Sequence, residues 1–78
     1  MAIYIPIRKV AEDEEFVEYW FEAAKTEGRI RFRKWSEEFT ILEPEPVGEL
    51  VAMASRVIYK VQKHMKNGEL PDETCWAA

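Results

Sequence analysis

One amphipathic helix in the second half of the chain constrains the fold more than any other feature of the sequence. Taking Ala54 as the centre of a helical wheel, seven other apolar residues between positions 47 and 65 fall within about 60° of it at the 3.6-residue period. The stripe is made of Val47, Leu50, Val51, Ala54, Val57, Ile58, Val61 and Met65. Asn67-Gly68 is typical of a left-handed C-terminal cap, and Pro71 prevents the helix from resuming.

The first half of the chain alternates apolar and polar residues, as strands with one buried face do. We expect strands over residues 3–10, 16–23 and 29–35, and a short fourth strand over residues 39–42. Because Ser36-Glu37 is a poor two-residue hairpin, one long bent strand over residues 29–42 is the alternative. Pro6 cannot donate a ladder hydrogen bond, which predicts that the first strand lies at a sheet edge.

The polar segment 25–28 predicts a tight hairpin, because it ends in Gly28, the residue type that best tolerates positive φ. A turn centred on Thr26-Glu27 satisfies hydrophobic, ion-pair and cation–π preferences in a single register. The predicted pairs are Ala23 with Ile30 and Phe21 with Phe32 on the core face, and Glu22 with Arg31 and Trp20 with Arg33 on the outer face.

These elements predict a single α+β domain over residues 1–78. It is an antiparallel three- to four-stranded β-meander with one C-terminal amphipathic helix packed on one face, a two-layer sandwich. A chain of 78 residues cannot divide its apolar surface between two cores. Residues 69–78 are expected to form a C-terminal tail whose Trp76 folds back onto the domain or stays free for a partner.

Charge and cysteine content limit the classes of function. The net charge of −4 repels nucleic-acid backbones and anionic membranes as a whole, so a nucleic-acid role would have to be local. The single cysteine, Cys75, cannot form an internal disulfide, which favours a reducing, cytoplasmic location. No secretory signal peptide is visible, and no apolar run approaches the roughly 20 residues that span a bilayer.

The sequence carries no catalytic motif, and we expect neither an enzyme, a cofactor nor a metal site. The acidic run 12–15 lacks the alternating ligands and the glycine of a calcium loop, and we interpret it as a solvated turn. His64 lies at the margin of the apolar stripe as a boundary residue. Cys75 has no basic cluster predicted beside it, so an inert thiol is expected.

The sheet face that the helix leaves uncovered is the candidate binding surface. Its expected members are Trp20, Arg29, Arg31, Arg33 and Trp35, with Tyr4, Arg8, Glu18 and Glu22 around them. Tryptophan, tyrosine and arginine dominate binding hot spots, which predicts a protein-interaction module that binds a protein partner or forms a homodimer. The alternative is single-stranded nucleic acid stacked on the same face. The plainest alternative is that these side chains only stabilise the outer side of the sheet.

A symmetric dimer is expected on geometric grounds as well. One helix is narrower than a three- or four-stranded sheet, so part of the sheet margin stays uncovered. The sequence predicts that the contact uses either the edge of the first strand, with Ile3, Ile5 and Ile7, or the tryptophan face.

Overall fold

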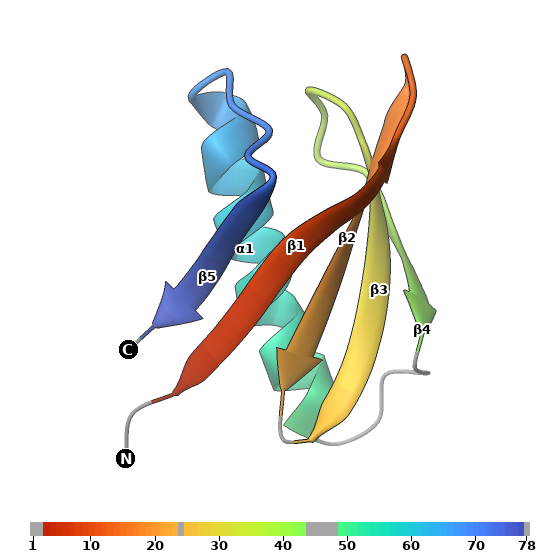
Figure 1. Ribbon diagram of the computed structural model, residues 1–78. Helices are drawn as coiled ribbons and strands as arrows, with labels where there is room; N and C mark the ends of the chain where they lie inside the picture. Colours follow the sequence, from red (N-terminus) through yellow and green to blue (C-terminus); the bar gives the residue numbers. More distant parts are fainter. Residues whose placement is uncertain (1–2, 24, 44–48, 78) are drawn as a thin grey trace.

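The computed structural model describes residues 3–23, 25–43 and 49–77. Four strands precede a single helix and a fifth strand follows it (Figure 1). The elements are β1 (Tyr4–Glu12), β2 (Phe16–Ala23), β3 (Thr26–Arg33), β4 (Phe39–Glu43), α1 (Glu49–Lys66) and β5 (Glu73–Ala77). The strands form one antiparallel sheet in the order β4-β3-β2-β1-β5, which confirms the α+β class and the separate fourth strand.

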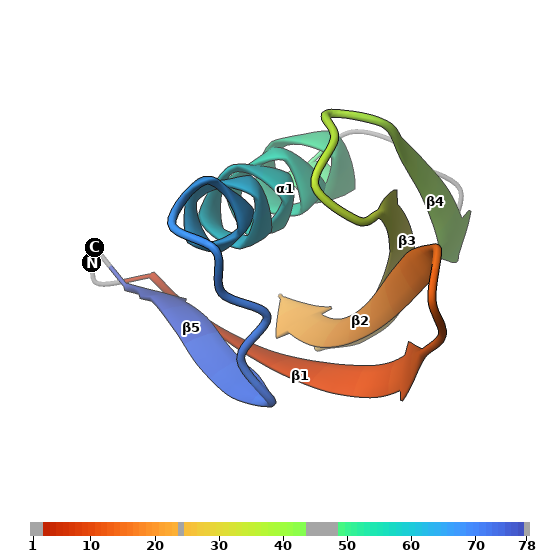
Figure 2. The same cartoon turned by 90° about the horizontal axis from the view of Figure 1, so that it is seen from above.

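The sheet curls around one side of α1, and the core fills the space between them (Figure 2). The sheet contributes alternate residues of its three central strands, and the helix contributes one stripe. The buried apolar residues are Ile5, Ile7, Val17, Tyr19, Phe21, Ala23, Ile30, Phe32, Ala54, Val57, Val61 and Met65. No helix among the described residues is long and apolar enough to cross a membrane.

The predicted helical stripe is confirmed over most of its described length. Ala54, Val57, Val61 and Met65 are buried, whereas Val51 at the edge of the stripe is 46% exposed. Val47 and the side chain of Leu50 lie outside the described residues. The helix ends as the sequence predicts, with Gly68 at φ +75° and two capping bonds: Glu69 N donates to His64 O (2.9 Å) and Gly68 N donates to Met65 O (3.0 Å).

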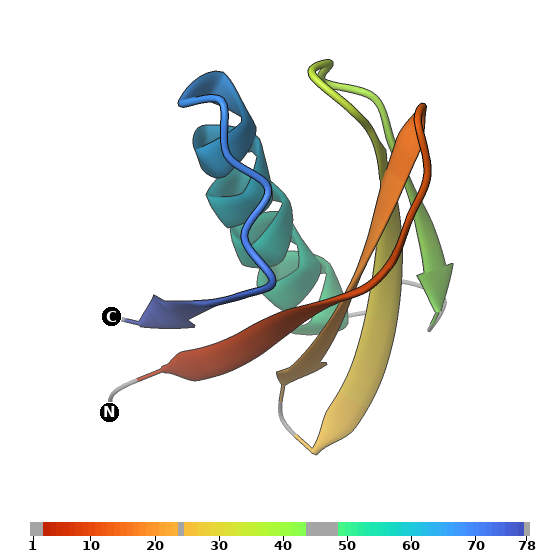
Figure 3. The ribbon, with the colours of Figure 1, turned by 45° about the horizontal axis from the view of Figure 1, so that its top comes forward.

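The expected edge position of β1 is wrong, because β5 pairs along its open side (Figure 3). The backbone shows how Pro6 fits inside the sheet. Lys9 N donates to Asp72 O at 2.8 Å, and bonded pairs alternate along an antiparallel ladder, so the odd-numbered residues of β1 bond to β5. The ring nitrogen of Pro6 therefore faces β2, one residue beyond the last β1–β2 pair at Ile7.

The predicted register of the β2–β3 hairpin is wrong as well. A two-residue connection joins Ala23 to Thr26, with Lys25 at φ +64°, so the turn lies two residues earlier than expected. The observed pairs are Val17 with Phe32, Tyr19 with Ile30 and Phe21 with Gly28 on the core face, and Glu18 with Arg31 and Trp20 with Arg29 on the outer face.

Gly28 is therefore a core residue and not a turn residue. It lies directly opposite Phe21, whose ring fills the space that a side chain at position 28 would occupy. A Cβ atom there would lie 2.6 Å from Phe21 Cε1 and 2.9 Å from the carbonyl oxygen of Glu43. The position needs glycine because of this close approach, since its φ is not in the left-handed region.

The segment expected as a tail contains β5. Its residues Thr74 and Trp76 pair with Ile7 and Ile5 on the helix side of the sheet, and Trp76 packs edge-to-face on Tyr59 of α1 with ring centroids 5.8 Å apart. The Tyr19 hydroxyl donates to Pro71 O at 2.7 Å and ties the α1–β5 connection to the sheet. Trp76 thus contributes to the core and does not cover the outer face.

Candidate interaction surface

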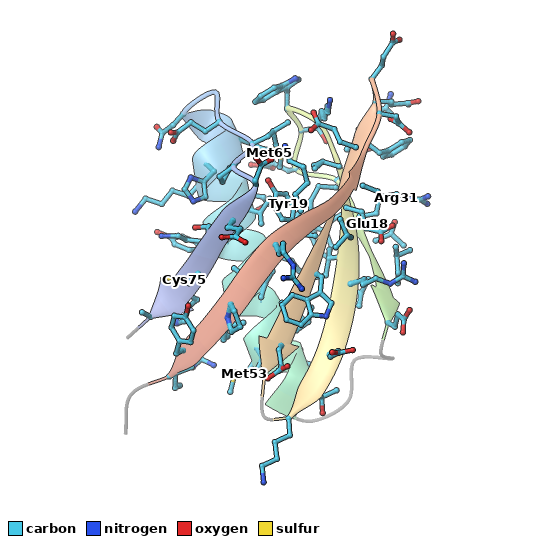
Figure 4. All side chains as sticks on the ribbon, viewed as in Figure 1. Glu18, Tyr19, Arg31, Met53, Met65 and Cys75 are labelled. Carbon is cyan, nitrogen blue, oxygen red and sulfur yellow. The ribbon has the colours of Figure 1, made fainter. Side chains whose placement is uncertain are left out.

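The outer face is the side of the sheet that points away from α1. Trp20 on β2 and Arg29, Arg31 and Arg33 on β3 project from it, as the sequence predicts, because paired residues share a face. Figure 4 is seen from this side, with Glu18 and Arg31 in front of the sheet and Tyr19 between the sheet and the helix. Among the described residues, no element covers this face.

Two of the three arginines are held by carboxylates. Arg29 bridges Glu18 (Nη1 to Oε2, 2.9 Å) and Glu43 (Nη2 to Oε1, 2.6 Å), and the hydrogen bonds to Glu43 raise the pKa of its guanidinium. Arg33 lies 3.1 Å from Glu15 and 3.7 Å from Glu38. Both guanidinium groups thus face two carboxylates of the domain.

Arg31, between them, has different surroundings. Its guanidinium carbon lies 5.1 Å from the ring centroid of Phe16, and no ion pair forms between it and another described residue. The side chain is exposed, and shallow hollows of about 190 and 290 Å³ lie on its two sides, both lined by Phe16 and Arg31. Arg31 is thus a cation held on an aromatic ring with its hydrogen-bonding edge available.

Trp20 stacks with a different arginine from the one the sequence predicted. Because the hairpin register is shifted, Trp20 lies opposite Arg29, and Arg8 of β1 lies on its other side with Cζ 4.8 Å from the ring centroid. The ring is partly buried. Two arginine–aromatic stacks, Arg8 on Trp20 and Arg31 on Phe16, therefore lie on adjacent parts of the outer face.

Sequence reasoning missed Phe16 as a member of the surface. Its position could be predicted from the sequence, because side chains alternate along a strand and Phe16 therefore shares a face with Glu18 and Trp20 of β2. Arg8 was placed on the correct face, but its contact with Trp20 depends on the β1–β2 register, which no local signal predicted.

Trp35 is not on the outer face. It lies in the β3–β4 turn, is 58% exposed and has φ +60°, a conformation that costs a residue with a side chain about 1–2 kcal/mol. Its side chain lines a hollow of about 220 Å³ beside the C-terminal part of α1, together with Met65, Gln62 and Lys66. The alternation that placed Trp35 outside ends with β3 at Arg33, because the turn reverses the chain.

The acidic run 12–15 forms ion pairs and turn hydrogen bonds at one end of the sheet. Glu12 lies 2.6 Å from Lys34 Nζ and 2.8 Å from Lys9 Nζ, and these ammonium groups lower the pKa of Glu12 to about 2. The same contact with Glu12 is the main reason that the pKa of Lys9 is raised. Asp13 Oδ1 accepts hydrogen bonds from the backbone of Phe16 (2.7 Å) and Glu15 (2.8 Å), which lower its pKa.

His64 and Cys75 have structural surroundings. His64 Nε2 lies 2.9 Å from Thr74 Oγ1 and joins the end of α1 to β5. The Cys75 thiol is free, half-buried and on the outer face of β5, opposite Pro6. Within the described residues, no group of three or more histidine, cysteine or acidic side chains is arranged to hold a metal ion.

Set against models of protein families, curated proteins and solved structures, the chain has no match.

Proposed function

We propose that this chain is a non-enzymatic protein-interaction module that binds a partner protein through its outer sheet face. The observation that carries the proposal is Arg31, an exposed guanidinium stacked on Phe16 and unpaired among the described residues. Its neighbours Arg29 and Arg33 each have two carboxylate partners. Arginine and large aromatic residues in such an arrangement are the usual carriers of binding free energy.

The arrangement also indicates the chemistry of the partner. Arg31 offers a bidentate donor for a carboxylate, and the flanking rings of Phe16 and Trp20 offer apolar surface. The partner surface is therefore a carboxylate next to apolar side chains. The surrounding carboxylates, such as Glu18 and Glu15, repel partners whose whole surface is acidic.

A photo-crosslinking residue at Thr40 tests the proposal, because Thr40 is exposed and lies opposite Arg31. The partner captured in cells is then purified and its affinity measured against Arg31→Glu and against Lys63→Glu on the exposed side of α1. Both substitutions change the charge equally. We expect at least a tenfold loss for Arg31→Glu and little change for Lys63→Glu, with unchanged circular dichroism.

A compensating charge change in the partner makes the test more specific. Replacing the matching carboxylate of the partner by lysine is expected to recover binding to Arg31→Glu and to weaken binding to the wild type. Equal affinity of the partner for the two charge variants would refute the proposal, as would the absence of any crosslink from position 40.

Single-stranded nucleic acid on the same face is the second proposal. Trp20 favours it, because bases stack on such rings. The ion pairs of Arg29 and Arg33 count against it, since phosphates would have to displace carboxylates, and the net charge of −4 adds repulsion. Titration of a labelled single-stranded oligonucleotide at low salt separates the two proposals, and no binding there rejects this one.

A further inference from the structure

The outer edge of β5 ends the sheet with backbone groups that have no strand beside them among the described residues. The hydrogen bond from Lys9 N to Asp72 O shows which groups these are. Even-numbered residues of β5 bond to β1, so the N–H and C=O groups of Glu73, Cys75 and Ala77 point away from the sheet. Each of these groups can accept or donate one ladder hydrogen bond to an added strand.

This edge lacks several of the features that usually prevent strands from pairing. The sequence of β5, ETCWA, contains no proline, lysine or arginine, and its register with β1 is unbroken. The opposite edge differs, because the β3–β4 register shifts between Arg29 and Ile30 and leaves an extra residue in β4. One edge of the sheet is thus irregular and the other is regular and open.

We infer that β5 pairs with β5 of a second copy of this chain, antiparallel and about a two-fold axis at Cys75. The edge is complementary to itself in this register. Cys75 exchanges both hydrogen bonds with the partner's Cys75, and Glu73 and Ala77 exchange theirs with the partner's Ala77 and Glu73.

The side chains suit the same register. Glu73 faces the small residue Ala77 of the partner, so no like charges are opposed on the outer face. On the helix side, Thr74 faces the partner's Trp76, which is partly buried. Tyr59, 57% exposed and packed on Trp76, adds apolar surface beside the contact.

The proposed contact is small. Two strands of five residues with flanking aromatic side chains lie at the low end of specific interfaces, so the dimer dissociates reversibly on dilution. The two outer faces then lie on the same side of one continuous sheet. The pairing does not depend on the proposed function, because Arg31 is three strands away from β5 in the sheet.

Sedimentation equilibrium under reducing conditions tests the pairing, from low micromolar to submillimolar concentration. For the wild type and Cys75→Ser we expect an average mass that rises above 9.2 kDa with concentration. Cys75→Pro removes an outward N–H that the fold itself does not use, so this variant keeps its circular dichroism and stays at 9.2 kDa. Arg31→Glu leaves the association unchanged.

Crosslinking provides a second measurement that does not need the proline variant. Bonded residues in an antiparallel pair have Cα atoms about 5.5 Å apart, within the range that a disulfide bridges. Mild oxidation is therefore expected to link wild-type chains through Cys75. A matched control, Cys75→Ser with Thr40→Cys, has its thiol on the same face near the other sheet edge and stays unlinked.

The inference is overturned by a constant mass of 9.2 kDa for the wild type over the whole range. It is also overturned if Cys75→Pro, still folded, associates as the wild type does, or if the control cysteine links as fast as Cys75.

Discussion

At the scale of single residues, the least expected finding is that glycine and tryptophan occupy positions contrary to their usual preferences. Gly28 sits in the interior of a strand with Phe21 across it, and Trp35 holds a left-handed turn conformation that glycine adopts more easily. The first is explained by packing, because the ring of Phe21 uses the space beside Gly28. The second places an exposed tryptophan beside the end of α1 at a cost in backbone energy.

We predict that Gly28→Ala lowers the free energy of unfolding by about 1–3 kcal/mol, because the added methyl group displaces the buried Phe21 ring. Urea denaturation followed by circular dichroism measures the loss. The control is Lys25→Gly in the turn, where a positive φ makes glycine neutral or stabilising. If Gly28→Ala were as stable as the wild type, the observed register of β2 and β3 would be wrong.

At the scale of elements, β5 has the largest effect on the arrangement. It converts β1 from an edge strand into an interior one, and it carries Trp76 to the core. The indole Nε1 of Trp76 is buried without a hydrogen-bond partner among the described residues. The contact of Trp76 with the core is therefore apolar, and its polar atom contributes a cost of about 1–3 kcal/mol.

We predict that a chain shortened after Glu69 is largely unfolded. Removing β5 exposes the edge of β1 and the side chains beneath Trp76, and a domain of this size has only roughly 5 kcal/mol of stability to lose. Circular dichroism and the loss of a cooperative thermal transition report the result.

A point variant of Trp76 distinguishes the contribution of β5 as a strand from the cost of the buried indole N–H. Trp76→Phe keeps an aromatic ring and removes the unpaired N–H, so its stability is expected within about 1 kcal/mol of the wild type. A shortened chain that melted cooperatively near the wild-type temperature would show that residues 70–78 are a dispensable tail.

At the scale of the whole molecule, charged groups join parts of the chain that are far apart in sequence. Glu12 at the end of β1 contacts Lys34 in the β3–β4 turn, and Lys9 contacts both Glu12 and Asp72 before β5. The cluster lies at one end of the sheet. A separate set of ion pairs on the outer face joins Arg29 to Glu43 of β4 and Arg33 to Glu38.

We predict that this cluster makes the domain sensitive to acid. The folded-state pKa of Glu12 is about 2, below its ordinary value of 4.5, and the pKa of Asp13 is lowered as well. A lowered carboxylate pKa stabilises the fold above the ordinary value, and this stabilisation is lost as the pH falls from about 4.5 toward 2. Urea midpoints across this range measure the loss.

Glu12→Gln is the matched variant, because it has nearly the same shape and no titrating group. It is expected to be less stable than the wild type at neutral pH and to lose less stability on acidification. Identical acid profiles for the two chains would show that Glu12 does not couple folding to pH.

The helix, the first four strand segments and the inward or outward direction of most side chains were determined by local sequence. The apolar period of α1, the cap at Gly68 and the alternation along β2 each follow from the geometry of one element, so they are readable without any partner. Four of the five residues proposed for the outer face were placed correctly by the same rule.

Tertiary contacts, and not local sequence, determine the register of β2 and β3, the interior position of β1, the strand at 73–77 and the location of Trp35. Each of these depends on contacts between residues far apart in the chain or on a turn that several sequences fit equally well. Moving the turn by two residues changes each cross-strand partner by four positions, from Ile30 to Thr26 for Ala23. An even shift keeps every side chain on its face, so alternation cannot distinguish the two registers. The fit of Phe21 over Gly28 distinguishes them, because these two residues lie opposite each other only in the observed register.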